Sequence, residues 1–308
     1  MSRRRGATGL RGILVVDKPT GPTSHDVVAR LRRASGESRI GHAGTLDPLA
    51  SGVLIVLVGS FARLDRYLTG CEKEYVAEVS FGTETDTDDA EGSVTMSSPV
   101  PDRILDAEYA TSVLEALRGP SLQKPPAYSA IKVQGRTAYS IARGGGEVIL
   151  EPRPIVIHEA ELLGIDPQMS SWQVRLLVSK GTYIRSVARD LGRSLGSAAH
   201  LSGLRRTASG VLGLDEAISL DQALQAGVDG TLPSLFASAP RALGFPVVEL
   251  SPAEVAAVLV GRSLPGDLAG DVADADQRVS LTRDGELIAV YRGKDGLLVP
   301  ETVMVSQS

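Results

Sequence analysis

The pattern of apolar and polar positions along the chain predicts a mixture of strands and helices. Residues 53–58 form an unbroken apolar run, which is typical of a strand buried on both faces, and residues 13–16 form a shorter run of the same kind. Residues 73–81 alternate as a strand does, with Tyr75, Ala77, Val79 and Phe81 on one face. Apolar residues at helical spacing, or start signals such as Thr23 and Asp26 at capping-box distance, predict further helices over residues 24–33, 61–68, 107–117 and 186–195.

Loop signals and changes in composition and predicted secondary structure divide the chain into three parts. Residues 1–10 are rich in arginine and glycine and are expected to be a flexible basic tail. Residues 11–245 read as one large domain of helices and strands. Residues 246–308 read as a small β-rich domain, with a helix opening at Ser251-Pro252 and a hairpin turn at Asp284-Gly285.

Charge is distributed unevenly along the 308 residues, whose formal net charge is −5. Residues 1–66 carry eleven Lys/Arg against five Asp/Glu, and residues 171–210 carry seven against one. Residues 247–308 carry five against ten. A local basic excess suits phosphate contacts, although solvated helix faces give the same count.

Cysteine content and hydropathy limit the class of protein. The single cysteine, Cys71, excludes a disulfide framework and a CxxC site, which favours a reducing, cytoplasmic environment. The apolar run at residues 53–58 is too short to span a bilayer, so no membrane is expected. The histidines show no metal-ligand spacing, so we expect no metal.

The stretch Ile40–Gly52 is the first candidate for chemistry. Three glycines and a proline within it predict a tightly specified loop over all thirteen residues, carrying one carboxylate, Asp47. An acid on a loop that precedes a buried strand can be a rigidly presented catalytic group. Asp before Pro is also a common turn starter, so composition alone leaves both readings open.

Two further segments combine charge with aromatic residues. Residues 123–145 mix prolines, glycines, cations and tyrosines, which suits either an RNA-facing segment or an exposed loop without a partner. Residues 179–186 place a cation, Arg185, and an aromatic residue, Tyr183, at the end of a predicted strand. An exposed ion pair is the ordinary explanation for such a cation.

Several of these motifs resemble one family. The run G-H-A-G-T-L-D-P-L-A-S-G-V-L at residues 41–54 and the run S-K-G-T-Y-I-R-S at residues 179–186 are similar to signatures of the TruB-type tRNA pseudouridine synthases. Weaker similarities are D-K-P-x-G-x-T-S from Asp17, T-D-T-x-D-x-x-G from Thr85, P-P-x-Y-S-A-x-K-x-x-G from Pro125, and L-R-R from Leu204. The resemblance covers roughly residues 12–215.

The resemblance implies a fold and a set of catalytic roles. The fold would be the α/β (α+β) pseudouridine-synthase fold, with a central mixed, largely antiparallel sheet and a thumb-like loop at about residues 123–153. A small C-terminal domain of PUA type would follow. Asp47 would be the nucleophile and Arg185 its charge partner, and Tyr75 would lie against the target base.

The same resemblance assigns the residues that bind the substrate. Tyr183 would flank the flipped base, Leu204 would pack against it, and His42 would occupy the space that the base leaves. Asp89 would lie near the substrate, and Lys18 belongs to a Lys-Pro loop that supports the active site. Lys180 belongs to the second strong motif and is assigned to substrate binding with it.

The reaction implied is the isomerisation of uridine 55 in the T-loop of tRNA to pseudouridine. It adds no group and changes no oxidation state, so we expect no cofactor. The partner would be the T-arm of tRNA, with no protein partner, and the chain would act as a monomer. A non-catalytic RNA-binding or tRNA-folding protein is the alternative. A carboxylate glycosidase or nucleosidase also stays open, although it needs a second placed carboxylate.

Overall fold

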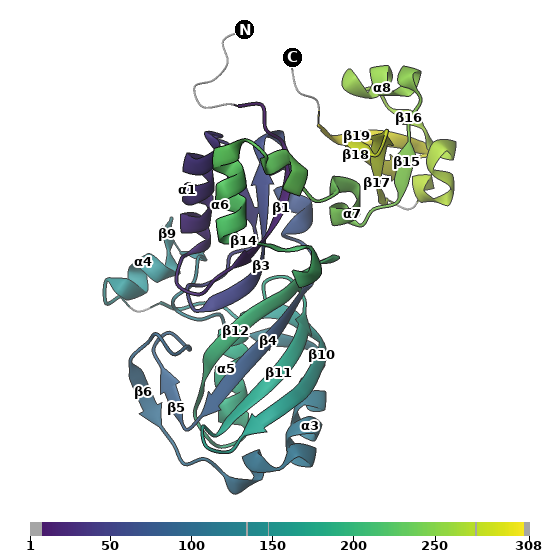
Figure 1. The fold of residues 1–308 in the computed structure, drawn as a ribbon. Coiled ribbons are helices and arrows are strands. Elements are labelled where there is room, and N and C mark those ends of the chain that lie inside the picture. Colours follow the sequence, from purple (N-terminus) through teal and green to yellow (C-terminus); the bar gives the residue numbers. More distant parts are fainter. Residues whose placement is uncertain (1–7, 134, 147, 275, 305–308) are drawn as a thin grey trace. The chain divides into compact units, whose positions relative to one another are not determined.

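The computed structural model describes residues 8–133, 135–146, 148–274 and 276–304 (Figure 1). Most of the basic tail expected at residues 1–10 lies outside this range, as do single positions of the thumb-like loop. The chain divides into two compact units, and each is described by itself. The first unit comprises residues 1–48, 52–71 and 208–308, and the second comprises residues 49–51 and 72–207.

The first unit contains a small mixed set of strands. Strand β1 (Gly12–Lys18) pairs antiparallel with β3 (Ala50–Val58), which also pairs antiparallel with β2 (Ile40–Ala43). On its other side β1 pairs in parallel with β14 (Ile218–Ser219). Helices α1 (Ser24–Ser35) and α6 (Leu220–Asp229) lie side by side, and α6 contacts β1 (Figure 1).

Helix α1 begins as the sequence predicts. Thr23 accepts a hydrogen bond from the Asp26 amide, and the Asp26 carboxylate accepts one from the Thr23 amide, so the capping box is formed. The helix ends at Gly36, whose φ of 69° is left-handed. The helix predicted over residues 61–68 is divided between two elements: its first half lies in the 3₁₀ helix η1 (Gly59–Leu64), and its second half forms α2 (Asp65–Leu68).

The prediction of one continuous loop over residues 40–52 is wrong. Ile40–Ala43 forms β2, and β3 already begins at Ala50, so the loop is confined to residues 44–49. The reason is tertiary: Gly41 and His42 pair with Leu57 and Val56 of the buried strand β3. Pairing with a buried neighbour outweighs the low strand propensity of glycine.

The end of the first unit is the small β-rich part that the sequence predicts. It is a five-stranded sheet in the order β15 (Val247–Glu249), β17 (Arg278–Arg283), β18 (Glu286–Lys294), β19 (Leu297–Val303) and β16 (Leu264–Pro265). Helix α8 (Pro252–Leu259) is capped by Ser251, as predicted. Asp284 and Gly285 both have positive φ, which the two-residue turn between β17 and β18 requires.

This C-terminal sheet shares an apolar core with the earlier part of the first unit. Leu287, Val290 and Met304 belong to the same buried cluster as Phe61 and Leu64. The remaining elements of the unit are β13 (Leu212–Gly213), η3 (Leu214–Glu216), η4 (Leu232–Leu235), α7 (Ala239–Leu243) and η5 (Gly266–Asp274).

The second unit is built on a sheet of long strands. Their order is β12 (Ala199–Ser209), β4 (Lys73–Phe81), β11 (Ser171–Val178), β10 (Arg153–Asp166) and β7 (Gly119–Gln123). β11 is antiparallel to both its neighbours, and β10 is antiparallel to β7. Helix α5 (Ile184–Ser194) contacts β4, and α3 (Ala107–Ala116) contacts β10.

The register of this sheet confirms the predicted alternation. Tyr75 and Ala77 stand opposite Leu176 and Val174, and these four side chains are buried. Smaller elements connect the sheet: hairpin β5 (Thr83–Thr85)–β6 (Val94–Ser97), η2 (Asp102–Leu105), hairpin β8 (Lys132–Val133)–β9 (Arg136–Thr137), and α4 (Ala138–Arg143). The predicted fold class is therefore confirmed: mixed α/β with largely antiparallel pairing and a small C-terminal β-rich part.

The packing of α5 against β12 can be tested at Gly192. A Cβ atom added at Gly192 would lie 2.5 Å from the Ala199 amide nitrogen. Helix propensity favours alanine over glycine by about 1 kcal/mol, whereas forcing atoms into a packed core costs about 1–3 kcal/mol or more. We expect Gly192→Ala to lower the free energy of unfolding, measured by urea denaturation. Gly164→Ala, whose added Cβ meets no atom within 4 Å, is the control and should change stability little.

Candidate functional site

The predicted site residues lie in both units. Lys18, His42 and Asp47 belong to the first unit, and Tyr75, Asp89, Tyr183, Arg185, Leu204 and Lys180 belong to the second. Each group is described within its own unit.

The backbone on both sides of Asp47 is held by hydrogen bonds. The hydroxyl of Ser24, which is buried at the start of α1, accepts a bond from the Leu46 amide at 2.8 Å and donates one to the Leu46 carbonyl at 3.0 Å. On the other side the Gly21 amide donates to the Pro48 carbonyl at 2.9 Å. Asp47 itself is half-buried between these two anchored neighbours. The loop therefore presents its carboxylate on a fixed backbone.

Lys18 explains why the segment that supplies Ser24 and Gly21 is itself rigid. Its side chain is fully buried, and the Nζ atom donates to the carbonyl oxygens of Pro19 and Pro22 at 2.9 and 2.8 Å. A buried ammonium needs such acceptors, so the lysine fixes the turn around itself. Lys18 therefore holds the backbone of the Lys-Pro loop, and its role at the active site stays a prediction.

His42 lies on β2, and its ring meets the ring of His25 edge to face. The centroids are 5.3 Å apart. His25 is exposed at the start of α1, next to Ser24. The start of α1 therefore contacts both the loop around Asp47 and the ring of His42.

In the second unit, arginines recur at every fourth position of α5. Because a helix has 3.6 residues per turn, Arg185, Arg189 and Arg193 share one side of α5. Each meets an acid of the segment 84–89: Arg185 Nη1 lies 3.5 Å from Asp89 Oδ2, Arg189 Nη1 lies 2.7 Å from Asp88 Oδ2, and Arg193 Nε lies 2.8 Å from Glu84 Oε1.

The backbone conformation at Asp88 allows the acids of this segment to pair with the arginines of α5. Its φ of 62° is left-handed, so the chain turns at Asp88, and the neighbouring Asp88 and Asp89 carboxylates both reach arginines of α5. Asp89 is further held by the Thr87 hydroxyl, which donates to its Oδ1 at 2.6 Å. Burial raises the pKa of the Asp88 carboxyl above its usual range, although the guanidinium groups of Arg189 and Arg185 act in the opposite direction.

The proline-rich segment that follows β7 is tied to the same helix. Gln123 and Tyr183 exchange two hydrogen bonds, from Gln123 Nε2 to the Tyr183 carbonyl at 3.1 Å and from the Tyr183 amide to Gln123 Oε1 at 2.8 Å. Arg185 donates to the carbonyls of Thr87 and Tyr128, each at 3.0 Å. The Arg185 side chain is therefore buried between the acidic loop and the proline-rich segment.

The expected thumb-like loop carries the aromatic residues of this region. The rings of Tyr128 and Tyr139 meet edge to face with centroids 5.9 Å apart. The Tyr128 hydroxyl donates to Asp86 Oδ2 at 3.4 Å, and partial burial together with the Asp86 charge raises the pKa of the Tyr128 phenol.

The other predicted residues of the second unit lie on strands or at their ends. Tyr75 is buried on β4, with 8% of its surface exposed, and Leu204 is half-buried on β12. Lys180 is exposed in the turn between β11 and α5.

Sequence reasoning missed Ser24, His25, Asp88 and Arg189. A signal was present for the last two, since arginines four apart on a predicted helix face the same way and Asp88 adjoins the predicted Asp89. The basic excess of residues 171–210 does not by itself indicate a phosphate-binding surface, because four of its cations form ion pairs within the protein. Among the described residues, Arg185, Arg189 and Arg193 pair with acids of other segments, and Arg175 pairs with Glu74, Glu159 and Glu161.

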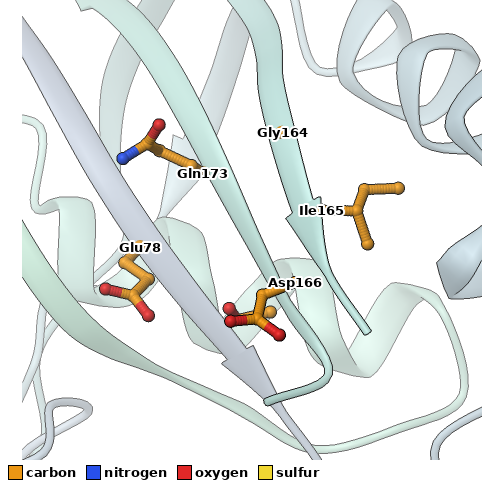
Figure 2. A pocket seen from close by; sticks show the side chains of 6 residues that line it. Glu78, Gly164, Ile165, Asp166 and Gln173 are labelled. Carbon is orange, nitrogen blue, oxygen red and sulfur yellow. The ribbon is translucent and has the colours of Figure 1, made fainter. Parts of the chain in front are cut away.

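A hollow of about 300 Å³ lies elsewhere in the second unit, between β4, β10 and β11 (Figure 2). Glu78, Asp166 and Gln173 contribute to its lining, and Figure 2 shows the Ile165 side chain pointing away from the Glu78 carboxylate. The predicted site residues are not part of that lining.

Within the described residues, no cluster of three or more His, Cys, Asp or Glu side chains is placed to hold a metal ion. None of the described helices combines the length and apolar character needed to cross a membrane.

Comparisons with known proteins agree with the motifs. The family model of the TruB family pseudouridylate synthase, N-terminal domain, matches residues 32–184. The chain is 45% identical to tRNA pseudouridine synthase B of Opitutus terrae over 239 residues, which is 76% of this chain and 97% of that protein. It is also 45% identical to tRNA pseudouridine synthase B of Mycobacterium tuberculosis over 286 residues, or 90% and 93% of the two chains. A solved chain in a Cbf5-Nop10-Gar1 complex matches with a TM-score of 0.71 at 27% identity, covering 96% of this chain and 85% of that one.

The two hydrogen bonds between the Ser24 hydroxyl and the Leu46 backbone can be tested in the absence of any substrate. Ser24→Ala removes the acceptor of a buried amide, which should lower the free energy of unfolding by about 1–3 kcal/mol and speed hydrogen exchange at Leu46. Ser35→Ala removes a hydroxyl at the far end of the same helix and is the control. Unchanged exchange at Leu46 would show that Ser24 does not hold the loop.

Proposed function

Since this chain belongs to the TruB family of pseudouridine synthases, we propose that it isomerises uridine 55 in the T-loop of tRNA to pseudouridine. The relatives named above act on tRNA by their names. The observation that best supports an active enzyme is the anchored loop, in which Ser24 and Gly21 fix the residues on either side of Asp47. A binding protein would not need one carboxylate held in this way.

The proposed reaction breaks the bond between N1 of the base and C1′ of the sugar. The base then rotates and C5 bonds to C1′. C5 loses its proton and N1 gains one, so the product is an isomer of the substrate. Asp47 is the proposed nucleophile, which divides one difficult step into easier ones. A carboxylate on a fixed backbone loses little freedom when it reacts, and such positioning can supply a large part of a rate enhancement. Atoms and charge balance without an added group, so the proposal includes no cofactor.

Arg185 and Tyr75 complete the proposed catalytic residues. The resemblance assigns Arg185 as the charge partner of the nucleophile, and its burial supports a fixed cation rather than a mobile surface one. The resemblance assigns Tyr75 to the target base. Its position on a buried strand supports a rigid aromatic surface.

The remaining residues are proposed to bind the substrate with its target base flipped out. Taking a base out of its stack costs a few kcal/mol, which is least for a loop base. Tyr183 and Leu204 would contact the base, His42 would fill the space it leaves, and Asp89, Lys18 and Lys180 complete the set. The tyrosines of the thumb-like loop, Tyr128 and Tyr139, support an RNA-facing surface because aromatic rings stack on unpaired bases.

We also propose the setting in which the enzyme acts. A single chain carries every residue assigned above, so we propose a monomer that binds the T-arm without a protein partner. The catalytic domain would comprise residues 11–245, with the thumb-like loop at about 123–153, and residues 246–308 would form a PUA-like domain. The single cysteine supports a reducing, cytoplasmic environment.

The nucleophile is tested by tritium release from T-arm RNA labelled at C5 of uridine. The wild type should release tritium without an added cofactor, and Asp47→Asn should abolish release while RNA affinity stays within about threefold, because the change keeps the size of the side chain and removes its nucleophilicity. Asp221→Asn, an exposed acid of the same unit, is the control. Strong residual release by Asp47→Asn would remove Asp47 from this role.

Base flipping is tested separately at His42. His42→Ala should slow single-turnover formation of pseudouridine, because the vacated space in the RNA stack is no longer filled. His158→Ala, a histidine on β10 that pairs with Glu72, should leave the rate unchanged. An unchanged single-turnover rate in His42→Ala would contradict the proposed role.

A further inference from the structure

Arg189 is a buried cation that the proposed mechanism does not use. Only 8% of its surface is exposed. Its Nη1 donates to Asp88 Oδ2 at 2.7 Å, its Nη2 donates to the Lys124 carbonyl at 3.0 Å, and its Nε donates to Asp190 Oδ1 at 2.9 Å. A buried guanidinium with this many partners has one favourable position.

Arg189 and Arg185 connect the same two segments to α5. Arg189 binds Asp88 of the acidic loop and Lys124 of the proline-rich segment. Arg185 binds the carbonyl of Thr87, the residue before Asp88, and the carbonyl of Tyr128. Each acceptor of Arg185 is therefore close in the chain to a group that Arg189 holds: Thr87 adjoins Asp88, and Tyr128 follows Lys124 by four residues.

The intervening chain can transmit this constraint. Asp88 joins Thr87 directly to Asp89, and both of these residues contact Arg185. Between Lys124 and Tyr128 lie Pro125 and Pro126, whose fixed φ angles make the segment stiff. A displacement of Asp88 or Lys124 would consequently move the groups that fix the Arg185 guanidinium.

We propose that the Asp88–Arg189 ion pair is a positioning pair for the active site, which holds the acidic loop and the proline-rich segment so that Arg185 keeps one orientation. This role rests on the proposed function, because it matters for catalysis only if Arg185 acts there. The neighbouring pair of Arg193 with Glu84 offers a comparison on the same helix, since the Arg193 side chain is 56% exposed.

The first test separates rate from affinity. Arg189→Gln should lower the single-turnover rate on T-arm RNA by about 10- to 100-fold, because small displacements of catalytic groups have effects of this size. The dissociation constant for the RNA should change by less than about threefold. Arg193→Gln should keep the rate within about threefold of wild type, because the Arg193 side chain, unlike that of Arg189, is mostly exposed. Asp88→Asn keeps the size and the acceptor of the side chain and should lose less activity than Arg189→Gln.

Several outcomes would overturn the proposal. They are a wild-type rate in Arg189→Gln, an equal loss in Arg193→Gln, or a loss that appears in RNA affinity instead of rate. If Arg189→Gln does not fold by circular dichroism, Arg189→Lys replaces it. Lysine keeps the charge but cannot satisfy all three acceptors in the same geometry, so a wild-type rate in that folded variant would equally contradict the proposal.

A second measurement does not depend on turnover. In ¹⁵N NMR spectra of the RNA-free protein, the Arg185 guanidinium should show separate, slowly rotating Nη groups, and these should average in Arg189→Gln or Arg189→Lys but persist in Arg193→Gln. If the wild type released no tritium, the proposed function would fail. The NMR result would still decide whether Arg189 positions Arg185, and an unchanged Arg185 signal in both Arg189 variants would refute it.

Discussion

The burial of arginine side chains on one side of α5 constrains much of the second unit. A guanidinium removed from water must be paired with carboxylates or carbonyls, or the folded state loses several kcal/mol. Arg185 and Arg189 meet this requirement by drawing two distant segments, around residues 84–89 and 123–128, onto the same helix. The position of the acidic loop and the start of the thumb-like loop both follow from it.

In the first unit, uncharged groups contact the candidate loop directly and fix its position. The loop that carries Asp47 is held by a serine hydroxyl and a backbone amide, and the buried ammonium of Lys18 fixes the turn that supplies them. The two units therefore place their candidate residues by different means, backbone hydrogen bonds around Asp47 and ion pairs around Arg185.

Charge counted along the chain is a poor guide to surface charge in this protein. The cations of α5 and Arg175 look like an RNA-binding excess in the sequence, yet acids from other segments pair with them. Exposed cations remain elsewhere, for example Arg30, Arg33, Lys124 and Lys180. These are better candidates for phosphate contacts, since pairing with RNA does not require breaking a buried ion pair.

The sequence by itself determined the local features. The capping box of α1, the alternation of β4, the Asp284-Gly285 turn and the motifs around Asp47 and Arg185 all depend on residues close together in the chain. Tertiary structure decided what depends on distant residues: strand β2, which pairing with β3 imposes on a glycine-containing segment, and the contacts of Arg189 with Asp88 and Lys124. Local sequence cannot specify these, because a strand needs a neighbour and a buried charge needs a partner, and here both come from other parts of the chain.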